Sequence, residues 1–124
     1  MKEYAIKCQR FQIESGERLS KATEQILRKL KASLHRLYGS RLKGLYLYGS
    51  FARGEERPGS DLDVAMILEN FERPWTEIQW TSQLVSDLSL EYGLTVSLIP
   101  LGNADWSMKQ KPLIRAIQRE GVSV

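Results

Sequence analysis

The chain has 124 residues, a length that suits one domain with a single hydrophobic core, and we expect residues 1–124 to form that domain. Its hydrophobic content of 42% and charged content of 27% are those of a globular protein, and no apolar run approaches the roughly 18 residues that would cross a membrane. One cysteine, Cys8, excludes an intramolecular disulfide. Because the first residues also lack the apolar segment of a signal peptide, we expect a cytoplasmic protein.

The net charge of +3 conceals an uneven distribution along the chain. Residues 1–57 contain 13 Lys and Arg against 6 Asp and Glu, whereas residues 58–124 contain 5 against 9. A basic first half is compatible with nucleotide phosphates, RNA or an acidic partner. A solvated helix face is the commoner origin of such a pattern, so we do not expect direct binding to nucleic acid.

Apolar residues recur in steps of three and four from about Glu17 to Tyr38, which predicts an amphipathic helix that ends at Gly39. The apolar stripe expected to face the core consists of Leu19, Ala22, Ile26, Leu30, Leu34 and Leu37. Residues 1–14 favour no single element and are compatible with a tail, a strand or a helix lead-in.

The rest of the chain alternates between strand and helix patterns. We expect a buried strand at 42–50, a polar turn with up to one helical turn at 51–60, a strand at 61–68, a helix from Pro74 that ends at Gly93, a strand at 94–101 and a helix at 112–120. The order α-β-β-α-β-α predicts an α/β (α+β) fold with a small mixed sheet flanked by helices. Core packing is the default expectation for Trp75, Trp80 and Trp106, and any of them that stays exposed could anchor a partner protein.

Asp61 and Asp63 are the strongest candidates for a functional site. Because side chains alternate along a strand, both carboxylates are expected on one face, roughly 7 Å apart along the backbone. Such a pair can hold divalent ions together with a substrate phosphate, and its hard oxygen atoms suit Mg²⁺ or Mn²⁺. An Asp-x-Asp pair alone is more often a solvent-facing strand end, so its surroundings decide the interpretation.

Gly49 and Ser50 end the preceding strand and provide those surroundings. Glycine lets a phosphate approach the backbone, and the Ser50 hydroxyl can donate a hydrogen bond to a phosphate oxygen. Arg53 is close enough in sequence to neutralise the phosphate charge. The spacing of Gly-Ser, ten residues and Asp-x-Asp therefore indicates a nucleotide site, with Gly49, Ser50 and Arg53 as nucleotide-binding residues.

The segment GSFARGEERPGSDLDVAMIL resembles the signature of the polymerase-β nucleotidyltransferase superfamily. The short chain and the Arg-Gly pair after Gly-Ser are similar to the minimal nucleotidyltransferases, many of which are antitoxin partners of HEPN-domain RNase toxins. The resemblance implies a polymerase-β-like fold, phosphate binding at Gly49 and Ser50, and Mg²⁺ binding and catalysis at Asp61 and Asp63. The implied reaction is transfer of AMP from ATP to a tyrosine of a HEPN toxin, and the implied partner is that toxin.

The sequence departs from this family in one respect. Members usually place a third carboxylate on the next strand, where this chain carries Ser97. A serine is neither an anionic ligand nor a base at neutral pH, so turnover is expected to be weak, absent, or dependent on another acid such as Asp105 or Glu69. Two alternatives therefore stay open, namely a weakened binding module that neutralises a HEPN RNase by contact, and a transferase that acts on a small molecule or RNA.

Overall fold

The computed structural model describes residues 20–124, so the expected helix start at 17–19 and the unassigned segment before it lie outside the described residues. The elements in chain order are α2 (Lys21–Tyr38), the 3-10 helix η1 (Gly39–Arg41), β1 (Leu42–Tyr48), α3 (Ser50–Arg53), β2 (Leu62–Leu68), α4 (Pro74–Tyr92), β3 (Val96–Gly102), α5 (Asn103–Met108), α6 (Pro112–Glu120) and β4 (Val122–Ser123). The predicted mixed α/β fold is confirmed, while the short elements α5 and β4 were not predicted. Within residues 20–124, no helix combines the length and apolar character needed to cross a bilayer.

Helix α2 begins after Ser20, whose hydroxyl accepts a hydrogen bond from the Thr23 amide at 3.1 Å. It ends at Gly39, as predicted, where φ is 56°. Ile26, Leu30 and Leu34 are buried as predicted, whereas Leu37 is 40% exposed and Tyr38 is buried instead. The buried residues are Thr23, Ile26, Leu27, Leu30, Leu34 and Tyr38.

The four strands form one mixed sheet in the order β3-β2-β1-β4. Strand β1 runs antiparallel to β2 and β4, and β2 runs parallel to β3. The register pairs Tyr48 with Asp63 across β1 and β2, and Asp63 with Ser97 across β2 and β3. Because paired residues share a face, these three side chains form one row near the start of β2.

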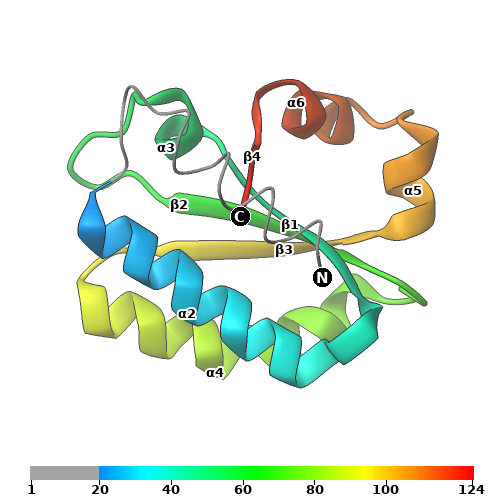
Figure 1. Ribbon diagram of the computed structural model, residues 1–124, viewed down its shortest axis with the longest axis horizontal. Helices are drawn as coiled ribbons and strands as arrows, with labels where there is room; N and C mark the ends of the chain where they lie inside the picture. Colours follow the sequence, from blue (N-terminus) through cyan, green and yellow to red (C-terminus); the bar gives the residue numbers. More distant parts are fainter. Residues whose placement is uncertain (1–19) are drawn as a thin grey trace.

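Figure 1 shows α2 and α4 on one side of the sheet, with α3, α5 and α6 on the other. The main apolar core lies on the α2/α4 side, where Leu62, Val64, Met66 and Leu68 of β2 are buried. Ala65 and Ile67, which alternate with them, are also buried, so only the start of β2 has a partly open face. Helices α5 and α6 thus leave the row of Tyr48, Asp63 and Ser97 accessible at one end of the sheet.

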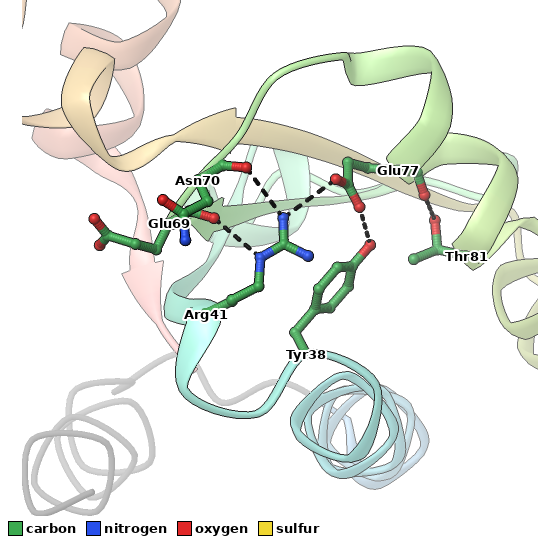
Figure 2. A network of polar contacts seen from close by, with 6 residues as sticks. All are labelled: Tyr38, Arg41, Glu69, Asn70, Glu77 and Thr81. Atoms are coloured by element: carbon green, nitrogen blue, oxygen red, sulfur yellow. Dashed lines mark hydrogen bonds and ion pairs between the residues drawn. The ribbon is translucent and has the colours of Figure 1, made fainter.

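A polar network joins the two large helices at the opposite end of β2 (Figure 2). The Tyr38 hydroxyl donates to a carboxylate oxygen of buried Glu77 at 2.7 Å, and Arg41 Nη2 lies 3.4 Å from the second oxygen. The Arg41 guanidinium also donates to the carbonyl oxygens of Glu69 and Asn70. The network fixes the end of α2 and the β2–α4 connection around one buried carboxylate.

The first half of α4 has polar residues inside and aromatic residues outside. Glu77 and Thr81 are buried, whereas Trp75 is 66% exposed and Trp80 is 61% exposed. The expectation that these two tryptophans pack in the core is therefore wrong. The inward face of α4 is formed instead by Glu77, Thr81 and Leu88, and Glu77 is held there by the Tyr38 hydroxyl.

Candidate functional site

Gly49 and Asp63 are in close contact at the ends of their strands. Gly49 adopts φ 77° and ψ −155°, a conformation that is essentially restricted to glycine. A Cβ atom at this position would lie 2.5 Å from Oδ2 of Asp63, so only glycine leaves room for the carboxylate. The Gly-Ser and Asp-x-Asp parts of the motif thus meet in the fold, where the Asp63 carboxylate packs against the turn that leads into α3.

Asp61 precedes β2 by one residue and is exposed, whereas Asp63 is the second residue of the strand and is half-buried. Burial raises the pKa of the Asp63 carboxyl above its ordinary value, and the negative charge of Asp61 raises it further. Arg53 acts on that pKa in the opposite direction. The two carboxylates are therefore electrostatically coupled, as their spacing predicts, and a cation between them would relieve their repulsion.

Ser97 occupies the neighbouring position on β3. Its pairing with Asp63 in a parallel register confirms the expectation that it shares the face of the carboxylate. Within residues 20–124, no group of three or more His, Cys, Asp and Glu side chains is arranged to hold a metal ion. The protein therefore offers two carboxylates and one hydroxyl here, a set of hard oxygen donors that fits Mg²⁺ or Mn²⁺ once further oxygen atoms come from a ligand.

The two acids considered as substitutes for a third carboxylate lie elsewhere. Glu69 follows the far end of β2, roughly 20 Å from Asp63 by strand rise, and accepts a hydrogen bond from Asn103. Asp105 lies on α5, which begins after the far end of β3, and it pairs with Lys111 at 3.0 Å. Neither acid pairs with Asp63 in the sheet, and each is engaged by a polar partner of its own.

Two tyrosines of β1 lie on the same face of the sheet as Asp63. Tyr48 lies opposite Asp63, and burial together with the Asp63 charge raises the pKa of its phenol. Tyr46 lies one row further along the same face and stacks on Trp106 of α5, with ring centroids 4.8 Å apart. The place of both tyrosines beside the carboxylates depends on the β1–β2 register, which local sequence does not encode.

Arg53 lies at the end of α3 and is engaged by two carboxylates. Its Nε atom is 2.8 Å from Glu55, and its Nη1 atom is 2.8 Å from Glu120 at the end of α6. Ser50 is the first residue of α3 and follows Gly49 directly. The other four predicted site residues thus lie around Asp63. Glu120 is a further neighbour that the sequence did not single out.

A family model for the nucleotidyltransferase domain matches residues 27–119. The matched segment covers most of the chain and includes Gly49, Ser50, Asp61 and Asp63. A search of curated proteins finds no significant match.

Several solved structures share this fold. A toxin–antitoxin structure with AMP-PNP is 21% identical, with a TM-score of 0.55, and the alignment covers 77% of this chain and 69% of the other. A Sulfolobus solfataricus protein, described provisionally as a nucleotidyltransferase, is 18% identical with a TM-score of 0.53, over 86% of this chain and 88% of the other. The toxin–antitoxin MntA-HpeT mutant Y104A is 18% identical with a TM-score of 0.52, over 78% and 70%.

Proposed function

Since the chain belongs to the nucleotidyltransferase domain family, we propose that it transfers AMP from ATP to a hydroxyl group on a partner protein. The observation that carries this proposal is the contact between Gly49 and the Asp63 carboxylate, beside the coupled carboxylate of Asp61. This contact places two anionic oxygen ligands next to a turn that a phosphate can approach.

In this proposal, Asp61 and Asp63 are the residues that would hold Mg²⁺ or Mn²⁺ beside the ATP phosphates. The ion would neutralise charge on the triphosphate and help to orient the reacting groups. Gly49 gives the phosphates access to the backbone, and the Ser50 hydroxyl and Arg53 guanidinium donate hydrogen bonds to them. The acceptor oxygen forms a bond to the α-phosphorus, the bond to the bridging oxygen of pyrophosphate breaks, and the acceptor loses its proton.

Ser97 limits the rate of that proton loss. A hydroxyl beside Asp63 can donate or accept a hydrogen bond, but it does not remove a proton from an acceptor at neutral pH. General-base assistance is typically worth about 10²–10⁴-fold, so we propose a slow transferase. Nucleotide binding is less affected, because the triphosphate supplies oxygen ligands of its own.

We further propose that the acceptor is a toxin with a HEPN domain and that this protein is its antitoxin. Two of the similar structures are described as toxin–antitoxin structures, and one of these contains AMP-PNP. The motif around Gly49 and Asp61 resembles that of minimal nucleotidyltransferases, many of which are antitoxin partners of HEPN toxins.

Ser97 also favours one competing function, in which the protein neutralises a toxin by contact without turnover. Incubation of the protein with labelled ATP, Mg²⁺ and the co-expressed partner, followed by intact mass measurement, separates the two. Transfer predicts a partner that is heavier by one AMP, whereas the contact model predicts an unmodified partner in a stable complex.

The variant Asp61→Asn/Asp63→Asn tests the site itself. We expect it to fold and to lose metal-dependent ATP binding in calorimetry, because the two anionic ligands are gone. Asp87→Asn, on the exposed surface of α4, is the matched control and should bind ATP normally. Unchanged ATP affinity in the folded double variant would refute the proposed site.

A further inference from the structure

The Arg53 guanidinium is held between two carboxylates from different parts of the chain. Nε contacts Glu55 two residues later, and Nη1 contacts Glu120 from the last turn of α6, each at 2.8 Å. The Arg53 and Glu120 side chains are 43% and 31% exposed, so both are accessible to a ligand in solvent. The contact with Glu120 therefore joins the candidate phosphate-binding turn to the C-terminal end of the fold.

The position of Glu120 is determined by the strand that follows it. Val122 of β4 pairs with Leu47 of β1, and the Gly121 amide donates to the Ile117 carbonyl at 2.7 Å. Since Leu47 lies two residues before Gly49, docking of β4 on β1 brings the end of α6 over α3. Glu120 is thus anchored beside the site through backbone pairing and does not depend on a flexible loop.

The charges around Arg53 do not suit an anion in this arrangement. One guanidinium paired with two carboxylates carries a net charge of −1, and Asp61 and Asp63 add further negative charge nearby. A triphosphate that approaches this cluster meets a cation that is already neutralised. Nη2 is the one Arg53 nitrogen that takes part in neither ion pair. Full engagement of a phosphate therefore requires one carboxylate to give way.

We propose that Glu120 is a latch on Arg53 that lowers nucleotide affinity until a triphosphate displaces it. This proposal rests on the nucleotide site proposed above and adds a residue that sets its affinity. Glu120 is the partner that exchanges, because its anchoring strand holds it in place while Arg53 turns toward the phosphate. Glu55 lies two residues from Arg53 and can accompany the side chain as it moves.

Calorimetric titration of the full chain with Mg–ATP tests the latch. We expect Glu120→Gln to bind roughly two- to fivefold more tightly than the wild type, the range of a partly exposed ion pair. Arg53→Gln should bind about tenfold more weakly, because a charge-assisted hydrogen bond to phosphate is lost. In the Arg53→Gln background, Glu120→Gln should no longer increase the affinity.

The control is Glu56→Gln, which removes a neighbouring exposed charge that forms no ion pair within the described residues. It corrects for the general effect of lower negative charge. Two results would refute the latch and leave the nucleotide site standing, provided that the wild type binds Mg–ATP. In the first, Glu120→Gln binds Mg–ATP no more tightly than Glu56→Gln. In the second, Glu120→Gln increases the affinity equally in the Arg53→Gln background. If neither the wild type nor any variant binds Mg–ATP, the nucleotide site is refuted and the latch with it.

Discussion

Asp63 and Ser97 lie opposite one another on the parallel strands β2 and β3. We expect Ser97→Asp to increase the rate of AMP transfer, by up to about 10²–10⁴-fold if it restores a general base. Affinity for Mg–ATP should change little, because the triphosphate carries ligands of its own. Single-turnover rates and calorimetry measure the two effects separately.

Ser97→Asn is the control for that substitution, since it matches aspartate in size and lacks the charge. It should leave the rate close to that of the wild type. If the wild-type enzyme is fast and Ser97→Asp slows it, Ser97 does not occupy the position of the third carboxylate.

Gly49→Ala should damage both the fold and the site. The new Cβ would meet the Asp63 carboxylate in a backbone conformation that alanine avoids, so we expect a loss of about 1–3 kcal/mol in unfolding free energy and at least tenfold in Mg–ATP affinity. Gly39→Ala is the control, because Gly39 has φ 56° and ψ −129° and nothing within 4 Å of an added Cβ. It should lose stability and keep nucleotide affinity, as urea unfolding and calorimetry would show. Equal losses of affinity in both variants would contradict the role of the Gly49–Asp63 contact.

Tyr38→Phe should destabilise the junction of α2 and α4. It removes the hydroxyl donor to Glu77, a buried carboxylate that then keeps, among residues 20–124, only the 3.4 Å contact with Arg41. The cost of such a partly unsatisfied group is about 1–3 kcal/mol, measured by urea unfolding. Tyr92→Phe is the control, since that hydroxyl reaches Gln25 only at 3.5 Å on the surface, and should cost less than about 0.5 kcal/mol. Equal effects of the two substitutions would contradict this assignment.

His35 should make the fold less stable in mild acid. Burial lowers the pKa of its imidazole below the ordinary value of 6.5, and Lys31 lowers it further. The folded state then binds the proton less readily than the unfolded chain. The contribution of neutral His35 to the unfolding free energy is therefore fully present above pH 6.5 and is lost as the pH falls below it. His35→Gln should flatten the unfolding free energy between about pH 7 and pH 5. Because His35 is the chain's one histidine, an unchanged pH profile would contradict its role.

The order of the main helices and strands could be predicted from the sequence, because apolar periodicity and glycine placement are local properties. Gly39 ends α2 and Gly93 ends α4 where the pattern places them. The spacing between Gly49 and Asp63 also predicted their proximity, because the short turn between two adjacent strands returns the chain to the same end of the sheet.

Other relationships required the tertiary structure. Helix periodicity locates the buried face only to within about one residue, so the pattern did not distinguish Leu37 from Tyr38 as the buried residue. The carboxylate of Glu77 is buried on α4 with a hydrogen-bond partner, Tyr38, that lies 39 residues away in sequence. Likewise, the ion pair of Arg53 and Glu120 spans 67 residues and exists because β4 pairs with β1. Contacts between distant segments depend on strand order and register, which are set by the packing of the whole chain and not by any local pattern.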